Sequence, residues 1–332
     1  MLHSLLKPLL FQCDPERAHH LTLTALKAAY SLGALKFSKT FQKPCTAFKL
    51  PFQNPLGLAA GFDKNGDYID PLLKMGFGFI EIGTVTPQPQ AGNPKPRLFR
   101  LDEDVAIINR MGFNNKGVHH LVKQLQKRKE AGIVGVNIGK NKDTPLDKAA
   151  EDYTYCLNHV YSVADYVTVN ISSPNTPELR RLQTPTYISQ LLSQLKNTQQ
   201  KLADQFHRYV PLCVKISPDL TDTELDPLIG AILQCKMDAV IATNTTVERP
   251  TSLQSIHKNE VGGLSGKPLL ETSTQSIKRI QQLVEGQLPI IASGGVMNLQ
   301  DAQQKWEAGA ILIQLYSGLI FSGFKLLSDI LS

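Results

Sequence analysis

Residues 167–176 read Val-Thr-Val-Asn-Ile-Ser-Ser-Pro-Asn-Thr, a β-rich run that ends in a cluster of neutral hydrogen-bonding side chains. The polar members of the cluster are Asn170, Ser172, Ser173, Asn175 and Thr176. The cluster contains no carboxylate and no histidine, so it suits recognition of a flat ligand rich in amide groups. Ser, Pro and Asn are also ordinary turn residues, and this stretch taken alone leaves both interpretations open.

Seven further apolar runs share this design, in which a short β-rich segment is followed at once by Gly, Asn, Lys, Ser or Thr. The eight predicted strands are residues 55–61, 77–84, 132–139, 164–172, 210–217, 237–245, 288–295 and 310–317. Most of these runs are nearly continuous in apolar residues, as is typical of parallel strands that are buried on both faces.

Helices are predicted between these strands, at residues 147–159, 187–206, 224–233, 272–284 and 299–308. Thr221 and Glu224 have the spacing of a capping box, and Asn298 stands where an N-cap is expected. Repeated β/α units predict a (β/α)8 TIM barrel, whose usual length of about 250 residues matches this part of the chain. Polar residues at the carboxyl ends of the strands then converge on one face of the barrel.

The composition is that of a soluble enzyme with one large core. With 332 residues, 42% of them hydrophobic, the chain can bury such a core and a small satellite. Its five cysteines are an odd number, widely scattered, which favours a reducing compartment over a disulfide framework or a zinc site. We expect no metal, no nucleic-acid partner and, because no apolar run approaches about 20 residues, no membrane-spanning helix.

Positive charge concentrates in the amino-terminal segment. Residues 1–50 hold seven Lys or Arg and two acidic residues, a net charge of +5 out of +6 for the whole chain. One short apolar helix is predicted around Pro8, and a second begins after the N-cap Asp14 and extends to about Tyr30. The apolar residues of the first helix are Leu5, Leu6, Leu9, Leu10 and Phe11.

Apolar helices with basic flanks are typical of a segment that binds a membrane surface reversibly. Each basic residue near an anionic bilayer contributes about 1 kcal/mol at best, so charge alone would hold the protein only loosely. An ordinary helical cap on the barrel is the alternative, and these residues alone support both interpretations. The early proline and the absence of a small-residue cleavage site argue against a secretory signal.

Two lysines stand at the predicted active face of the barrel. Lys64 follows small residues that let a planar ring approach the backbone, and it either meets an anionic ligand or is a solvated surface lysine. Lys215 lies inside the predicted strand 210–217, where a lysine is rarely buried without a partner or a task. A fixed positive charge beside a reduced flavin ring is a task of that kind.

The loops of this face add amide groups and glycines. The connection between the second and third strands exceeds 45 residues and includes Asn-Arg-Met-Gly-Phe-Asn-Asn at 109–115, and a connection of that length usually carries function. Glycine pairs occur at 262–263 and 294–295, and Tyr-Ser-Gly stands at 316–318. Backbone amides near the last two strands of a barrel commonly hold a phosphate, so these glycines favour a phosphate-bearing cofactor.

Several motifs make a family resemblance specific. They are Leu-Ala-Ala-Gly-Phe-Asp-Lys at 58–64, Glu-Ile-Gly-Thr-Val-Thr-Pro at 81–87, Asn-Arg-Met-Gly-Phe-Asn-Asn at 109–115, Val-Asn-Ile-Ser-Ser-Pro-Asn-Thr at 169–176, Ala-Thr-Asn-Thr-Thr at 242–246 and Gly-Gly-Leu-Ser-Gly at 262–266. Together with residues 11–19, they resemble the dihydroorotate dehydrogenases of the quinone-dependent class 2, from end to end. The resemblance implies FMN on the barrel top, dihydroorotate stacked on it, and orotate and reduced quinone as products.

The resemblance also implies roles for particular residues. Ser173 would be the base that removes the C5 proton while hydride passes from C6 to the flavin, helped by Thr176 or a bound water because a free hydroxyl is a poor base. Residues implied for the substrate are Lys64, Asn109, Arg110, Met111, Gly112, Phe113, Asn170, Asn175, Asn244 and Thr245. Those implied for FMN are Ala60, Gly61, Lys64, Thr84, Asn137, Asn170, Lys215 and Thr243, with Gly266, Gly295, Tyr316 and Ser317 at its phosphate. For the quinone, the residues implied are His19 and Arg100.

The same resemblance divides the chain into a two-helix quinone and membrane-surface segment, 1–40, and an FMN-binding barrel, 41–332. It implies a peripheral protein at the cytoplasmic face of the inner membrane, using ubiquinone or menaquinone, with a monomer favoured. One departure from the family pattern is Ala-Ser-Gly-Gly at 292–295, where relatives more often have Gly-Val-Gly-Gly. One alternative is a class 1 flavin dehydrogenase that uses NAD or fumarate; it is disfavoured because class 1 enzymes have cysteine in place of Ser173. The other alternative is a non-redox barrel that binds a phosphorylated metabolite.

Overall fold

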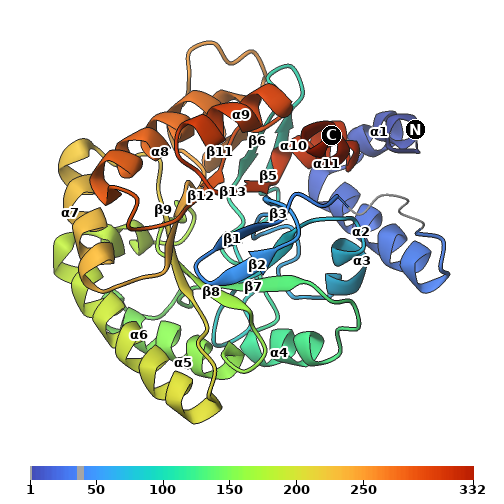
Figure 1. The fold of residues 1–332 in the computed structure, drawn as a ribbon. Helices are drawn as coiled ribbons and strands as arrows, with labels where there is room; N and C mark the ends of the chain where they lie inside the picture. Colours follow the sequence, from blue (N-terminus) through green and yellow to red (C-terminus); the bar gives the residue numbers. More distant parts are fainter. Residues whose placement is uncertain (1, 36–40) are drawn as a thin grey trace.

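A closed barrel of eight parallel strands forms the centre of the protein (Figure 1). The computed structural model describes residues 2–35 and 41–332, with side chains described from residue 7 onward. The strands in order around the barrel are β3 (Leu56–Leu58), β4 (Phe79–Val85), β7 (Ile133–Ile138), β8 (Tyr166–Asn170), β9 (Leu212–Ile216), β10 (Ala239–Ala242), β12 (Ile290–Ser293) and β13 (Leu312–Leu315). Seven of them lie within the runs predicted from the sequence, and β4 extends one residue beyond its predicted run, to Val85. The predicted TIM barrel is therefore confirmed.

Helices surround this barrel, and all five that the sequence predicts are present. These are α5 (Ala149–Val160), α6 (Pro185–Phe206), α7 (Asp222–Gln234), α8 (Leu270–Val284) and α9 (Leu299–Glu307). The Glu224 carboxylate accepts a hydrogen bond from the Thr221 N–H at 2.9 Å, and the Asn298 side chain accepts one from the Asp301 N–H at 2.9 Å. The helices that the sequence did not predict are α3 (Ile69–Leu73), α4 (Val118–Gln126), α10 (Ser317–Ser322) and α11 (Lys325–Leu331), all of nine residues or fewer.

The two ends of the barrel are closed differently. A hairpin of β1 (Cys45–Ala47) and β2 (Leu50–Phe52) packs Phe48 and Phe52 against Phe79 and Tyr166 of the barrel strands. At the carboxyl ends of the strands lies an antiparallel sheet of β5 (Leu98–Leu101), β6 (Ala106–Asn109) and β11 (Gly263–Gly266). The long connection between β4 and β7 thus folds into part of this sheet, which was not predicted from the sequence.

The amino-terminal helices α1 (Leu2–Gln12) and α2 (Pro15–Ser31) confirm the predicted pair, and Figure 1 shows them beside α10, α11 and α3. Asp14 caps α2 by accepting from the Arg17 N–H at 2.9 Å. Lys36 and Lys39, which contribute to the basic charge of the segment, and the proposed boundary at residue 40 lie outside the described residues, as do the side chains of Leu5 and Leu6. Within the described ranges, no helix has the length and apolarity needed to cross a bilayer.

Two contacts fasten these helices to the β5 region. Arg97 donates to both carboxylate oxygens of Glu16, at 3.1 Å from Nε and 2.7 Å from Nη2, with both side chains buried. Arg100 Nη2 donates to the Phe11 and Cys13 carbonyl oxygens at 2.5 and 3.0 Å, and its guanidinium lies 4.4 Å from the centre of the Phe11 ring. Arginine side chains from the barrel insert therefore hold the end of α1 and the start of α2.

Candidate active site

A cavity opens at the carboxyl ends of the barrel strands, between them and the sheet of β5, β6 and β11. It encloses about 1100 Å³ of empty space, its open mouth included. The predicted site residues that line it are Ala60, Gly61, Lys64, Thr84, Asn109, Met111, Gly112, Phe113, Asn170, Ser173, Asn175, Lys215, Thr243, Asn244, Thr245, Gly266, Gly295, Tyr316 and Ser317. The fold thus brings together polar residues from every barrel strand end except that of β7.

Four predicted site residues lie away from this lining. Arg110 directs its Nη1 to Glu260 Oε2 at 2.6 Å, so its side chain pairs with a carboxylate of the neighbouring loop. Asn137 is wholly buried beneath the cavity surface. His19 and Arg100 lie at the amino-terminal helices and the β5 region.

The floor of the cavity is a chain of buried amides and hydroxyls. Asn170 Nδ2 donates to Thr84 Oγ1 at 3.0 Å and to Asn137 Oδ1 at 3.1 Å. Thr84 Oγ1 donates to the same Asn137 oxygen at 2.5 Å, and Asn137 Nδ2 donates to Glu81 Oε1 at 2.8 Å. These hydrogen bonds fix which side of each amide donates and which side accepts. The Thr84 hydroxyl and the Asn170 amide are therefore oriented before any ligand binds.

Glu81, which was not predicted from the sequence, supports the cavity floor from inside the barrel. It is fully buried on β4, and its Oε2 accepts from Tyr166 Oη at 2.9 Å, Thr168 Oγ1 at 3.0 Å and Gln314 Nε2 at 2.7 Å. The signal in the sequence was a carboxylate inside a continuous apolar strand. Gln314 was missed as well, although it lines the cavity and its buried Oε1 has no partner among the described residues.

Lys215 places a buried cation against the cavity. Its residue is 6% exposed, and none of the residues that the structure describes accepts a hydrogen bond from its Nζ. Burial lowers the pKa of Lys215, and the Glu81 carboxylate counteracts this by raising it. An unpaired buried ammonium facing a cavity fits a ligand that carries or develops negative charge.

Lys64 also lines the cavity, from the loop that follows β3. Burial lowers the pKa of Lys64 to about 8; Arg97 lowers it further, while Glu16 and Asp63 raise it. The side chain remains mostly protonated at neutral pH. It therefore offers a cation to an anionic ligand at the cavity wall.

Ser173 lies in the loop after β8 and is buried. Its Oγ accepts from the Asn175 N–H at 3.2 Å, and Asn175 Nδ2 donates to Asn109 Oδ1 at 3.2 Å across the cavity mouth. The buried hydroxyl of Thr176 has no partner among the residues described. The loop thus places a serine hydroxyl and an amide at the cavity, and a threonine hydroxyl that is buried behind the cavity lining.

Glycine shapes the far end of the cavity. Gly295 has a φ of +83°, and a Cβ there would lie 2.3 Å from Leu270 Cα, so no other residue fits without displacing the backbone. In the described part of the chain, the N–H groups of Gly295 and Val296 have no hydrogen-bond acceptor. Ser265 and Ser317 hydroxyls lie 2.9 Å apart at the same end. The Asp301 carboxylate binds the next N–H along, that of Met297, at 2.8 Å, which leaves the two preceding amides and the hydroxyls to fit a phosphate group.

His19 and Arg100, predicted as quinone contacts, have different surroundings. His19 Nε2 donates to the Phe62 carbonyl oxygen at 2.9 Å, and burial, with Lys64 and His20 adding, lowers its pKa to about 3, so the ring is neutral. The His19 and Phe62 ring centres are 5.1 Å apart, and those of Phe62 and Tyr316 are 5.6 Å apart. Aromatic rings therefore form a continuous path from α2 to the cavity lining, whereas Arg100 is occupied with carbonyl groups of α1 and its end.

Comparisons with known proteins agree on one family. A family model described as Dihydroorotate dehydrogenase matches residues 44–332. A relative from Coxiella burnetii named Dihydroorotate dehydrogenase (quinone) is 51% identical over 332 residues, which are 99% of this chain and 96% of the relative. One of the same name from Acinetobacter baylyi is 51% identical over 333 residues, 100% of this chain and 99% of the relative. The crystal structure of ligand-free DHODH from Eimeria tenella matches with a TM-score of 0.88 and 39% identity, covering 96% of this chain and 93% of that one.

Proposed function

The chain belongs to the dihydroorotate dehydrogenase family, and from that premise we propose how its cavity works as an active site. The protein is an oxidoreductase that oxidises dihydroorotate to orotate in pyrimidine biosynthesis, with a quinone as the final electron acceptor. Its family is one of flavoenzymes. The alternative of an NAD- or fumarate-linked dehydrogenase is not favoured, because the relatives that match over nearly the whole chain are quinone enzymes.

We propose that the flavin is FMN. When bound, FMN supplies the hydride acceptor and passes the electrons on to quinone. Its ring fits beside Lys215, Thr84 and Asn170, where a buried cation and pre-oriented polar groups face the cavity. Its phosphate fits the end formed by Gly266, Gly295, Tyr316 and Ser317, with Asn137 holding the polar floor from below.

The substrate is proposed to lie between this floor and the Ser173 loop. The Lys64 cation pairs with the substrate carboxylate, while the amides of Asn109, Asn175 and Asn244 bind the ring amides. Met111, Gly112, Phe113 and Thr245 complete the walls. Arg110 contributes through its backbone, since its guanidinium binds Glu260.

Ser173 Oγ is proposed to take the C5 proton of the substrate. The observation that carries this role is the buried Ser173 hydroxyl at the cavity, which accepts a hydrogen bond from a backbone N–H and keeps its own proton free to donate. A hydroxyl is a weak base, so Ser173 has to give up its own hydroxyl proton as its Oγ takes the C5 proton. The unsatisfied Thr176 hydroxyl in the same loop is suited to pass that proton onward.

The quinone is proposed to enter between α1 and α2 and approach the cavity along His19, Phe62 and Tyr316. Arg100 would act at this entrance, where no residue in the described ranges accepts a hydrogen bond from its buried Nε. Leu9 and Leu32, 64% and 83% exposed, provide apolar contacts for a membrane surface. We propose peripheral attachment at the cytoplasmic face of the inner membrane, through these helices.

Replacing Ser173 by alanine tests the central assignment. The purified protein is expected to be yellow, and Ser173→Ala should retain FMN and bind orotate while flavin reduction by dihydroorotate, followed by stopped flow, slows by about 100-fold or more. Near-normal reduction in this variant would refute the base assignment. A colourless preparation that cannot be reconstituted with FMN would refute the choice of flavin.

A further inference from the structure

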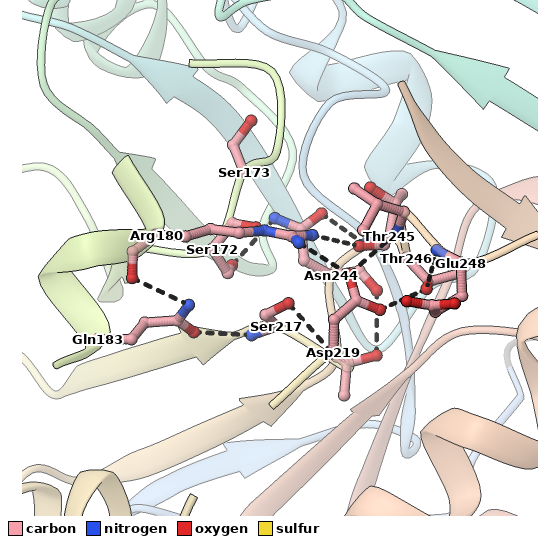
Figure 2. Close-up of polar contacts among 12 residues, drawn as sticks. Ser172, Ser173, Arg180, Gln183, Ser217, Asp219, Asn244, Thr245, Thr246 and Glu248 are labelled. Atoms are coloured by element: carbon pink, nitrogen blue, oxygen red, sulfur yellow. Dashed lines mark hydrogen bonds and ion pairs between the residues drawn. The ribbon is translucent and has the colours of Figure 1, made fainter. Parts of the chain in front are cut away.

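An ion pair outside the cavity joins three loops at the carboxyl ends of neighbouring strands (Figure 2). Arg180 lies in the short 3-10 helix Leu179–Gln183 after the β8 loop, and Asp219 lies in the loop after β9. Arg180 Nη1 donates to Asp219 Oδ2 at 2.8 Å, and the two side chains are 25% and 10% exposed. Neither residue lines the cavity, so the pair acts on the site from outside it.

The remaining Arg180 contacts reach the backbone of two loops that do line the cavity. Arg180 Nε donates to the Ser172 carbonyl oxygen at 3.3 Å, and Nη2 donates to the Thr245 carbonyl oxygen at 3.1 Å. Ser172 directly precedes Ser173, and Thr245 is part of the cavity wall after β10. One planar guanidinium therefore sets the separation between the Ser173 loop and the Thr245 loop.

Asp219 anchors the other side of the arginine. Its carboxylate accepts from the Thr246 hydroxyl and, at 2.9 Å, from the Val247 N–H. The Asp219 N–H donates to Ser217 Oγ at 3.2 Å, and the Ser217 N–H donates to Gln183 Oε1 at 2.9 Å, which leads back to the 3-10 helix. The network closes on itself across the loops that follow β8, β9 and β10.

Ser172 transmits this arrangement to Ser173. The Ser172 hydroxyl donates to Asn170 Oδ1 at 3.1 Å and accepts from Asn244 Nδ2 at 3.0 Å, while its carbonyl is held by Arg180. Ser173 points away from this cluster in Figure 2. Its position is thus determined largely by the residue before it.

We propose that Arg180, held by Asp219, is a positioning residue that places Ser173 for proton removal and fixes the width of the substrate site. This rests on the proposed role of Ser173. A lysine at position 180 keeps the charge but lacks the planar fork needed to bind two carbonyls and a carboxylate together. A misplacement of a reacting group by about 1 Å can slow a reaction roughly 100-fold. Replacing the guanidinium should therefore slow flavin reduction by shifting Ser173, although no contact to the substrate is removed.

The test compares Arg180→Lys and Asp219→Asn holoenzymes with the wild type in single-turnover stopped flow. Arg180→Lys is expected to slow flavin reduction by dihydroorotate about 10- to 100-fold. Reoxidation of the reduced flavin by a ubiquinone analogue, which does not involve Ser173, should stay within about twofold of the wild-type rate. Asp219→Asn should show the same split with a smaller loss, because the arginine keeps its carbonyl partners.

Arg181→Lys is a matched control in the same helix. Arg181 is exposed and pairs with Glu178 on the surface, so both half-reactions should remain at wild-type rates. If Arg180→Lys reduces its flavin within about twofold of the wild-type rate, the positioning proposal is overturned. If Arg180→Lys does not yield folded, FMN-loaded protein, Asp219→Asn decides the question by the same criterion.

A double-variant cycle separates positioning of Ser173 from general damage to the site. In the Ser173→Ala background, Arg180→Lys is expected to cause a clearly smaller loss than it causes alone, because the hydroxyl that it positions is already absent and only its effect on the width of the substrate site remains. A further loss equal to that of Arg180→Lys alone would show that Arg180 does not act through Ser173. Normal flavin reduction in Ser173→Ala by itself would instead reject the base assignment, and that result is read independently of the Arg180 variants.

Discussion

Replacing Glu81 by glutamine is expected to destabilise the barrel and loosen the cavity floor. Glu81 Oε1 accepts one hydrogen bond, from Asn137 Nδ2, and Oε2 accepts three. A glutamine keeps an oxygen for the three donors but turns its NH2 group toward the Asn137 amide nitrogen. The NH2 group of the introduced glutamine and that of Asn137 would then face each other as two donors, where the Glu81 oxygen had accepted from Asn137.

The size of the effect follows from these contacts. One buried donor left without an acceptor costs about 1–3 kcal/mol, and three bonds lose the strength that a charged acceptor gives. The neutral amide no longer carries the desolvation penalty of a buried carboxylate, which offsets part of the loss. We therefore expect the free energy of unfolding to fall by about 2–4 kcal/mol, and by more in Glu81→Leu, which leaves four donors unsatisfied.

Urea denaturation at a fixed excess of FMN measures this change, since bound cofactor shifts the midpoint. With an m value of roughly 3 kcal/mol per molar urea, the midpoint of Glu81→Gln should fall by about 1 M. The variant should also retain less FMN, because the pKa of Lys215 is no longer raised by the Glu81 carboxylate. A midpoint within about 0.2 M of the wild type would refute the reasoning.

Two further predictions concern Lys64 and Glu16. The pKa of Lys64 is lowered to about 8, so its cation is present below that pH and lost above it. In steady-state kinetics across pH, KM for dihydroorotate should therefore rise above pH 8 in the wild type but not in Lys64→Met. Burial alone would raise the pKa of Glu16, but Arg97 and Lys95 outweigh it and lower the pKa below 4.5. The Glu16 carboxylate therefore stabilises the fold above pH 4.5. This stabilisation is lost as the pH falls through the lowered pKa. Glu16→Gln should cost roughly 3 kcal/mol at neutral pH and slow flavin reoxidation by quinone more than flavin reduction. Equal slowing of the two half-reactions would contradict the placement of the quinone entrance at α2.

The barrel strands and five of its helices were predictable because each is specified by its own segment. The strands are short, nearly continuous apolar runs that end in polar residues, and the five helices show N-cap signals or helical periodicity in their own segments. The sheet of β5, β6 and β11 was not predictable in this way. Each of its strands is four residues long, and β11 is separated from β6 by more than 150 residues, so only closure of the barrel brings them together.

Most of the candidate site residues were named from the resemblance to the family, and the barrel explains why those at its strand ends meet on one face. Ser173, the asparagines around it and Lys215 carry their chemistry within single short stretches of sequence. The partners of Glu81, the side-chain direction of Arg110 and the pairing of Arg180 with Asp219 depended on the tertiary structure. Each of these is a contact between loops or strands that are distant in sequence, and hydrogen bonds of 2.6 to 3.3 Å form only after packing has fixed which backbones are neighbours. The sequence determined which chemical groups are available, and the tertiary packing determined which of them touch.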